Sequence, residues 1–382
     1  MILIQNGHIK TMAGEEYENG CILLGDDGKI AKIAPSIEAP EGAYVIDAEG
    51  KLVTPGCVDA HCHIGLHEQA MRWEGSDVNE KGDPVTPHMR AIDAIRPHDE
   101  MFENAISHGV TCGVTGPGSA NVVGGTFVAI KLWGESVDEM IVKEPVAMKV
   151  AFGENPKGAY GNTLKKMPTT RMGNAAMLRE TLFKAKEYLD AKNSDKAPKF
   201  DMKMEAMLPV MRKEIPLKAH AHRADDILTS IRIAKEFDVD LTLDHCTEGW
   251  LVADILAKEG YPAFVGPTLG SKSKIELAGK SFKTAAVLYE AGVNISIITD
   301  APVVPIQYLP LSAGLHVAAG LPEEEAWKAI TINPATACGI ADRVGSLVEG
   351  KDADVVIWTA DPLKVVGAQA YVTIINGEIV YQ

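Results

Sequence analysis

The amino-acid sequence predicts an α/β protein: a (β/α)8 TIM-like barrel with a small β-sandwich domain formed by both termini. Two observations carry this prediction. Between residues 55 and 344, short apolar strands alternate with helical stretches, which is typical of parallel βα units. Before and after this region the chain reads as short strands separated by turns. We therefore expect a composite small domain of residues 1–54 and 345–382, and a barrel of residues 55–344.

The composition indicates a chain with a large buried core and no affinity for anionic polymers. Of the 382 residues, 46% are hydrophobic and 23% are charged. The 52 acidic residues exceed the 37 basic ones, so the formal net charge is −15. This charge repels phosphate backbones and anionic lipids, so we expect a small-molecule substrate and neither nucleic acid nor membrane as a partner.

The cysteines and the apolar segments indicate where the protein is found. The six cysteines are scattered without a CxxC pair, which resembles neither a disulfide framework nor a structural zinc site. The first residues lack the pattern of a secretory signal, and no segment reaches the roughly 18 consecutive apolar residues of a membrane span. We expect reduced thiols and a cytoplasmic location.

The strands of the small domain are predicted from alternating segments between turn residues. At the N-terminal end these segments are MILIQNGHIKTM, CILLGDDGKIAKIA and AYVIDAEGKLVTPG. At the C-terminal end they are DADVVIWTA and AYVTIINGEIVYQ, the second of which is split by Asn376-Gly377. Because both ends have this character and the middle does not, we expect them to pair.

Eight apolar segments supply the expected barrel strands: CVDAHCH, VTCGVTG, TFVAIKL, VAMKVAFG, IPLKAHAH, DLTLDHC, YPAFVG and VNISIITD. Helices are expected at 97–108, 174–192, 224–236, 250–258 and 281–291. The active site of such a barrel lies at the carboxyl ends of its strands, where long loops shape the pocket.

Histidines gather at the ends of these predicted strands. His61 and His63 close the first strand, and side chains two apart on a strand point to the same side. His220 and His222 end the fifth strand, and His245 lies near the end of the sixth. These five of the eleven histidines, together with an aspartate, Asp300, at the end of the eighth strand, should therefore meet at one face of the barrel.

This set of residue types indicates a divalent metal. Imidazoles and a carboxylate suit zinc, which we expect first, or iron, manganese or nickel. A bound divalent ion lowers the pKa of its water to roughly 7, so attack by metal-bound hydroxide is the expected chemistry. Asp300 beside that water is the expected general base, and it would return the proton to a leaving nitrogen. His245 or the metal would stabilise the developing oxyanion.

Two motifs resemble those of the amidohydrolase superfamily. The run Val53 to His63, VTPGCVDAHCH, is similar to the superfamily signature PG-x-x-D-x-H-x-H. Residues 328–356, KAITINPATACGIADRVGSLVEGKDADVV, are similar to its closing segment. The resemblance covers essentially the whole chain, and the imidazolonepropionase-like subgroup is the most similar. It implies a hydrolase of carbon–nitrogen bonds other than ordinary peptide bonds, with paired barrels common, so a homo-oligomer is an open alternative to a monomer.

The resemblance also implies the ligands. His61, His63, His220 and Asp300 would hold the metal, and His245 would be a ligand of a second ion or a contact of the substrate. His222 is expected behind these ligands, because it lies beyond the strand end.

The fourth strand decides whether one or two ions bind. Two-metal relatives carry a carboxylated lysine there, and Lys149 is the only lysine inside the apolar run. The alternative is Glu154, at the level where the other ligands end. These positions differ by five, so in a regular strand they face opposite sides and only one should be a ligand. We favour Glu154 from the sequence, although an outward-facing Lys149 under the helices would be costly.

The function expected from these residues is metal-dependent hydrolysis of a small molecule, first of all a cyclic amide. The enzymatic alternatives are a metallo-dipeptidase, an N-acyl amino acid deacylase and a heterocycle deaminase. The non-enzymatic alternative is a silent barrel that binds a ligand, which the presence of the complete ligand set disfavours.

Overall fold

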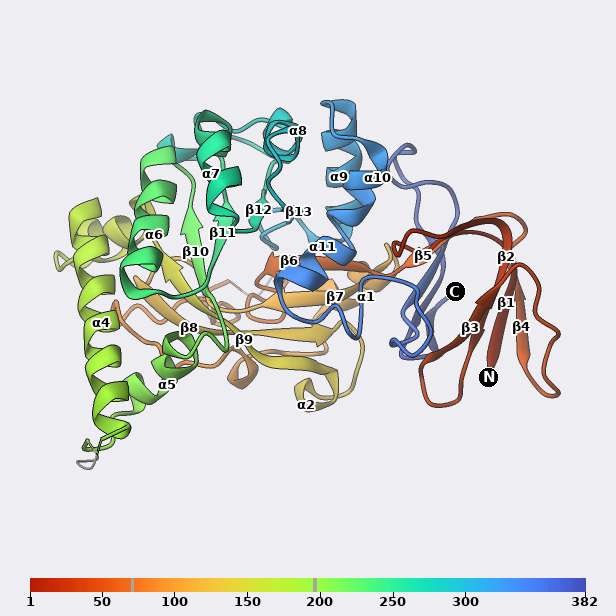
Figure 1. The fold of residues 1–382 in the computed structure, drawn as a ribbon, viewed down its shortest axis with the longest axis horizontal. Helices are drawn as coiled ribbons and strands as arrows, with labels where there is room; N and C mark the ends of the chain where they lie inside the picture. Colours follow the sequence, from red (N-terminus) through yellow and green to blue (C-terminus); the bar gives the residue numbers. More distant parts are fainter. Residues whose placement is uncertain (70–71, 195–197) are drawn as a thin grey trace.

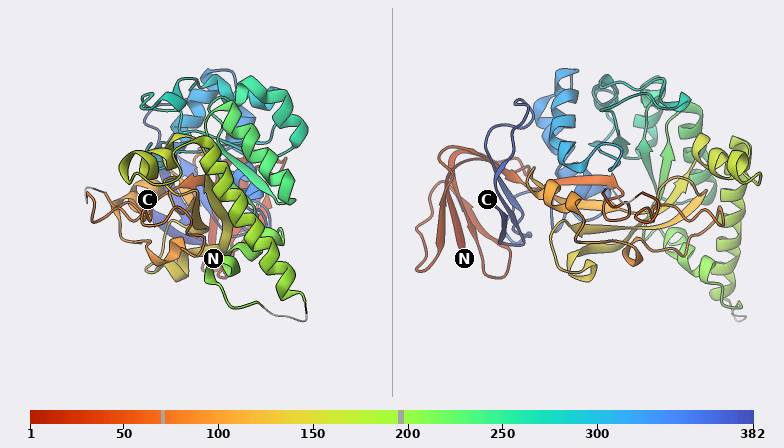
Figure 2. Two further views of the ribbon diagram at one scale, coloured as in Figure 1. Left: turned by 90° about the vertical axis from the view of Figure 1, so that its left-hand side faces the viewer. Right: turned by 180° about the vertical axis from the view of Figure 1, so that it is seen from behind.

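A computed structural model describes residues 1–69, 72–194 and 198–382. It contains two sheets, one built from the middle of the chain and one from its two ends (Figure 1). The sheet of the two ends lies at one side of the molecule, where the red N-terminal and blue C-terminal strands run next to each other (Figure 2). Among the described residues, no helix has the length and apolar content needed to cross a bilayer.

The sheet from the middle of the chain contains all eight strands predicted for the barrel. Its order is β13-β12-β11-β10-β9-β8-β7-β6. The strands are β6 (Cys57–Cys62), β7 (Val110–Thr115), β8 (Val123–Lys131), β9 (Ile141–Ala151), β10 (Leu217–Ala221), β11 (Leu241–His245), β12 (Ala263–Val265) and β13 (Ile295–Ile297).

Backbone hydrogen bonds nearly close this sheet into a barrel. Beyond the end of β13, the N–H of Asp300 donates to the carbonyl of His61 at 3.0 Å, and the N–H of His63 donates to the carbonyl of Ala301 at 2.8 Å. The two outer strands of the sheet therefore lie beside each other at the end that carries the histidines. The predicted TIM-like barrel is confirmed in this form.

One strand of the barrel runs against the predicted direction. β8 is antiparallel to both β7 and β9, whereas β6–β7 and β9 through β13 pair in parallel. A parallel connection needs a crossover of a dozen or more residues, usually with a helix. Residues 116–122 are too few for this and contain no helix, so the chain returns as a hairpin. The expectation of eight parallel βα units is therefore wrong at this strand.

Helices cover the outside of the barrel, and all five predicted helices are present with ends shifted by a few residues. The longer ones are α1 (Glu100–Ile106), α4 (Arg171–Lys192), α5 (Met202–Met211), α6 (Ala224–Phe237), α7 (Ala253–Glu259), α8 (Lys283–Glu290), α9 (Leu309–Ala318), α10 (Glu323–Lys328) and α11 (Ile332–Ala337). The shorter α2 (Val137–Met140) and α3 (Glu154–Pro156) flank β9.

The local sequence explains where these helices begin and end, and which of their faces is buried. Asp99 caps α1 by accepting from the N–H of Met101, and Thr170 caps α4 by accepting from the N–H of Gly173. α6 ends at Asp238, which takes a left-handed conformation. Its buried residues recur at helical spacing and pack on the sheet: Asp226, Ile227, Ser230, Ile231, Ile233, Ala234 and Phe237.

The second sheet, also of eight strands, joins the two ends of the chain as expected, but the predicted β-sandwich is not confirmed. Its strands follow the order β16-β15-β14-β5-β1-β2-β3, and β4 pairs with β1. They are β1 (Ile2–Lys10), β2 (Glu16–Leu24), β3 (Ile30–Ala34), β4 (Tyr44–Asp47), β5 (Leu52–Pro55), β14 (Val355–Trp358), β15 (Ala370–Ile375) and β16 (Glu378–Tyr381). The division into 1–54 with 345–382 and 55–344 stays a prediction.

Candidate metal centre

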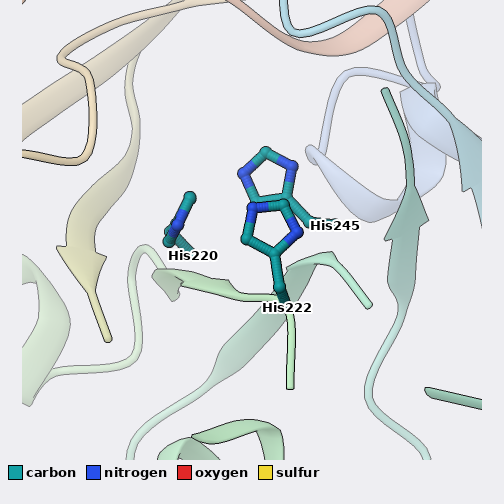
Figure 3. Close-up of side chains that lie close together, drawn as sticks. All are labelled: His220, His222 and His245. Atoms are coloured by element: carbon teal, nitrogen blue, oxygen red, sulfur yellow. The ribbon is translucent and has the colours of Figure 1, made fainter. Parts of the chain in front are cut away.

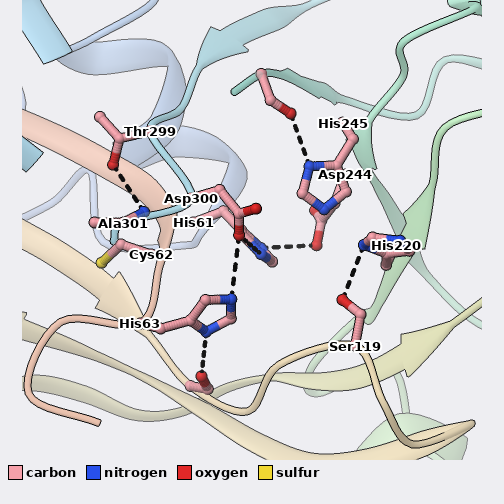
Figure 4. Close-up of polar contacts among 12 residues, drawn as sticks. His61, Cys62, His63, Ser119, His220, Asp244, His245, Thr299, Asp300 and Ala301 are labelled. Atoms are coloured by element: carbon pink, nitrogen blue, oxygen red, sulfur yellow. Dashed lines mark hydrogen bonds and ion pairs between the residues drawn. The ribbon is translucent and has the colours of Figure 1, made fainter. Parts of the chain in front are cut away.

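The barrel strands bring the predicted histidines and the aspartate together at one end (Figure 4). His61 and His63 come from β6 and the residue after it, His220 from β10, His245 from β11, and Asp300 from the loop after β13. All four imidazoles are buried, and 16% of the Asp300 side chain is exposed. The face predicted from the strand ends is therefore formed, although its occupation by a metal stays a prediction.

Two groups of possible ligand atoms share one histidine. The ligand atoms of His61, His245 and Asp300 lie within 4.8 Å of one another, and so do those of His220, His222 and His245. Figure 3 shows the second group, in which the rings of His222 and His245 are stacked with centroids 4.5 Å apart. His222 thus lies beside His220 and His245, whereas the sequence placed it behind the ligands.

Each imidazole is held by a contact at Nδ1. The partners are Asp244 Oδ2 for His61 at 2.9 Å, the carbonyl of Gly116 for His63 at 2.7 Å, Ser119 Oγ for His220 at 2.8 Å, Thr247 Oγ1 for His222 at 2.7 Å and the carbonyl of Gly266 for His245 at 2.7 Å. Such contacts fix the tautomer and the ring orientation of metal-binding histidines. They leave Nε2 of every ring available for a ligand.

The contacts of Asp300 show why a cation fits between these atoms. Its Oδ1 lies 3.1 Å from Nε2 of His63 and 3.3 Å from Nε2 of His61. A carbonyl or carboxylate oxygen only accepts, so Nδ1 of both rings carries the proton, and in a neutral ring Nε2 carries a lone pair. Lone pairs on Nε2 and a carboxylate oxygen repel each other unless a proton or a metal ion lies between them.

His245 also directs an Nε2 lone pair to the centre, and it does so from a strained part of the backbone. Its Nε2 is buried and has no hydrogen-bond partner among the residues that the structure describes. His245, Cys246 and Asp300 have φ values of 77°, 45° and 54°, which non-glycine residues rarely adopt. Strain of this kind persists where the surrounding structure enforces it, often at functional sites. Here it turns two strand ends so that their side chains face the centre.

Burial sets the protonation of these groups. It lowers the pKa of His61, holds the pKa of His220 and His222 well below the usual value, and lowers the pKa of His245 to about 3. Burial alone would raise the pKa of Asp300, but its close contacts with the imidazoles of His61 and His63 outweigh it and hold that pKa well below its usual range. Neutral imidazoles and an ionised carboxylate are the forms that bind a metal.

The fourth barrel strand brings Lys149 to the imidazoles. Lys149 is fully buried, and its Nζ lies 3.4 Å from Nε2 of His61. Burial lowers the pKa of this lysine to about 8. Glu154 lies beyond Gly153, whose φ of 76° turns the chain out of β9 into α3, and its N–H donates to Glu276. Which of the two, Lys149 or Glu154, is the ligand from this strand stays a prediction.

Several residues at the centre were not predicted. Ser119 comes from a loop and Glu276 from a 3-10 helix of three residues (Ile275–Leu277), and such segments have no periodic spacing that would reveal their position. Glu276 is buried, with Oε1 3.6 Å from Nε2 of His220 and 3.7 Å from Nε2 of His222. Asp244 and Lys218 did carry a signal, because each is a charged residue inside an apolar strand.

A pocket of about 330 Å³ opens onto this centre. His63, His220, His222 and Asp300 form part of its wall. Lys274 lines the other side, where its Nζ contacts Glu276 Oε1 and Asn155 Oδ1, the latter at 2.9 Å. A small molecule in this pocket would therefore meet the imidazoles and the carboxylate directly.

Comparison with known proteins identifies related sequences. Residues 52–380 match the model of the amidohydrolase family. The amidohydrolase tasK of Hapsidospora irregularis is 30% identical over 385 residues, which cover 92% of this chain and 39% of that protein. This chain thus spans well under half of the length of tasK. An imidazolonepropionase of Bacillus velezensis is 25% identical over 362 residues, which cover 85% of this chain and 79% of that enzyme.

Solved structures share the fold over the whole chain. A crystal structure of an amidohydrolase from Thermotoga maritima is 40% identical, with a TM-score of 0.96 and full coverage of both chains. A Xaa-Pro dipeptidase with bound methionine is 16% identical, with a TM-score of 0.61 and full coverage of both chains. The second likeness shows the fold alone.

Proposed function

This chain belongs to the amidohydrolase family, and we propose that it is a metal-dependent enzyme that hydrolyses a carbon–nitrogen bond in a small cyclic amide. The observation that supports this most directly is the arrangement around Asp300. Nε2 of His61 and of His63 face its carboxylate at 3.3 and 3.1 Å, with Nδ1 of both rings already engaged. A zinc ion held by these atoms would satisfy all of them.

The residues fit a metal centre in which a bound cation and Asp300 have different roles. A divalent cation bound here supplies an acidic water and a polarised carbonyl. Asp300 is ionised and lines the pocket, and both of its contacts with imidazoles use Oδ1. Its carboxylate can therefore take a proton from the attacking water and return it to the leaving nitrogen.

The contacts of His245 favour the role of a ligand over that of an oxyanion donor. Its Nδ1 must donate to the carbonyl of Gly266, because a carbonyl cannot donate. Its low pKa, about 3, keeps the ring neutral, so Nε2 has no proton to give to an oxyanion. Stabilisation of negative charge on the substrate then belongs to the metal rather than to His245.

A second ion is a specific alternative that the same centre supports. His220, His222 and His245 form a group that does not include Asp300, and Lys149 lies on β9, next to β10 of that group, with its Nζ 3.4 Å from Nε2 of His61 in the other group. Carboxylation of Lys149 would provide a ligand for both ions. A two-metal centre is the observation that would favour a dipeptide or an N-acyl amino acid as the substrate.

Metal analysis combined with one variant tests the proposed function. We expect purified protein to contain one equivalent of zinc per chain, or two with bicarbonate dependence if Lys149 is carboxylated. A screen of lactams, hydantoin-like rings and N-acyl amino acids should identify a substrate. In Asp300→Asn, turnover of that substrate should fall by about 10²–10⁴-fold while the metal content stays mostly intact. A near-normal rate in this variant would remove Asp300 from the mechanism.

The cellular location and the oligomeric state of the enzyme stay predictions. We propose a cytoplasmic location, consistent with the six cysteines, all of which are free and buried. A homo-oligomer is proposed only from the resemblance to similar proteins.

A further inference from the structure

A fully buried lysine lies beneath the candidate metal centre. Lys218 is two residues before His220 on β10, inside the barrel. Its Nζ donates to the carbonyl of Ala60 at 2.9 Å and to Asp244 Oδ1 at 3.1 Å. The same atom lies 4.1 Å from the ring centroid of Phe264, a cation–π contact. The charge of Lys218 is thus fixed in place by strands on three sides.

Asp244 connects this lysine to the metal centre. It is fully buried on β11, next to His245. Its Oδ1 faces Lys218, while its Oδ2 lies 2.9 Å from Nδ1 of His61. Nε2 of His61 in turn faces Asp300. A chain of polar contacts therefore runs from Lys218 through Asp244 to a predicted ligand.

We propose that Lys218 and Asp244 are positioning residues for the metal centre. In this inference, which rests on the proposed function, Lys218 fixes the carboxylate of Asp244, and Asp244 fixes the tautomer and the direction of His61. A carboxylate on Nδ1 also makes Nε2 a better electron-pair donor. Partners of this kind are typically worth 10- to 100-fold in metal affinity or activity.

Stability alone gives a poor reason for this pair. Removing two charges from water is costly, and well-packed apolar residues of similar volume often stabilise a core as much or more. Lys218 lies among Phe264 and Phe127, where an apolar side chain would pack without any desolvation cost. Packing therefore gives no reason for a buried charge pair here, whereas the contact of Asp244 with His61 does.

The barrel offers a matched control at its opposite end. Lys131, at the end of antiparallel β8, is equally buried, and its Nζ lies 2.6 Å from Asp354 Oδ2 and 3.0 Å from Asp352 Oδ2. This lysine joins the barrel to the segment that leads into β14. It reproduces the burial and the ion pairing of Lys218 without any contact to the predicted ligands among the described residues.

Binding of cobalt(II) to the metal-free protein tests the proposal. Wild type, Lys218→Met, Asp244→Asn and Lys131→Met are titrated with Co²⁺, and the visible spectrum is recorded as a report of ligand geometry. We expect Lys218→Met and Asp244→Asn to lose 10- to 100-fold in affinity and to show shifted bands. Lys131→Met should keep the affinity and the bands of wild type, even though its thermal midpoint falls.

Two outcomes would overturn the proposal: unchanged affinity and bands in Lys218→Met, or the same change in Lys131→Met. Should Lys218→Met fail to fold, Asp244→Asn decides by the same two readouts, because it preserves the shape of the side chain. A wild-type chain that binds no Co²⁺ would instead contradict the proposed function itself. The two failures are therefore distinguishable.

Discussion

Each imidazole of the centre has one nitrogen committed to the protein and one directed inward. The committed nitrogens contact two carbonyls, two hydroxyls and one carboxylate, which come from the loop after β7, from β11 with the residues just after it, and from the turn after β12. This arrangement orients the lone pairs before any ligand arrives, so little rearrangement is needed on binding. Pre-orientation at the level of single residues is the physical basis of the proposed metal site.

Ser119 provides a test of this pre-orientation. Its Oγ lies 2.8 Å from Nδ1 of His220, so Ser119→Ala should free that ring to rotate. We expect metal affinity to fall by about 10- to 100-fold, measured by competition with a chelator. Ser273→Ala is the control, because Ser273 lines the same pocket and has no described contact with an imidazole. Equal affinities in the two variants would contradict the role given to Ser119.

A histidine far from the centre predicts part of the acid sensitivity. His316 is fully buried on α9, its Nδ1 donates to the carbonyl of Phe282, and burial lowers its pKa to about 4. In the unfolded chain the imidazole of His316 has a pKa near 6.5. Between pH 6.5 and 4 it therefore binds a proton in the unfolded chain but not in the folded one. The contribution of His316 to the free energy of unfolding is therefore fully present above pH 6.5 and decreases on acidification. At pH 4 it has fallen by about 3 kcal/mol.

His316→Gln should remove this contribution. Urea unfolding of the metal-free protein at several pH values between 4 and 7 measures it. We expect the variant to lose less stability than wild type as the pH falls. Parallel curves for the two proteins would show that His316 does not couple folding to pH.

At the residue scale, the strand ends were the informative part of the sequence. His61, His63, His220, His245 and Asp300 were predicted because the carboxyl ends of barrel strands share one face. The choice between Lys149 and Glu154 depended on where β9 stops, and the left-handed Gly153 that ends it carries no strong signal in an isolated sequence. Ser119 and Glu276 were missed because a loop and a 3-10 helix of three residues, which have no periodic pattern, bring them to the centre.

At the scale of elements, the hairpin of β7, β8 and β9 sets this barrel apart from a regular one. The apolar composition of β8 predicted a buried strand but not its direction, which the short preceding loop decides. The same loop, residues 116–122, supplies the carbonyl of Gly116 and the hydroxyl of Ser119 to the imidazoles. The antiparallel return thus brings two of the five Nδ1 partners to the centre.

The turn after β12 offers a test at this scale. Gly266 has a φ of 143°, its carbonyl holds His245, and an added Cβ would lie 2.3 Å from the carbonyl oxygen of Ile298. Gly266→Ala should therefore cost about 1–3 kcal/mol and also lower metal affinity. In Gly260→Ala, where φ is 76° and no atom of the described part of the chain lies within 4 Å of the added Cβ, only the backbone strain applies.

Thermal unfolding and metal titration of both variants measure these effects. We expect Gly260→Ala to keep the metal affinity of wild type despite a lower midpoint. A normal affinity in Gly266→Ala would show that the turn does not position His245.

At the scale of the whole molecule, the two ends of the chain close on each other around the barrel. β5 precedes the first barrel strand and pairs with β14, which follows the last barrel element. Buried ion pairs of Lys131 with Asp352 and Asp354 join the same regions. The pairing of the ends was predicted from their shared strand character, but the order of strands in the sheet was not, because local patterns do not specify partners across 300 or so residues.

A crystal structure of the zinc-loaded protein, with anomalous data collected at the zinc edge, tests the central claim most directly. We expect an anomalous peak about 2.0–2.2 Å from Nε2 of His61, Nε2 of His63 and a carboxylate oxygen of Asp300. A second peak beside His220 and His245 would add the two-metal form. A peak elsewhere, or none while these side chains keep their positions, would contradict a metal centre at this end of the barrel.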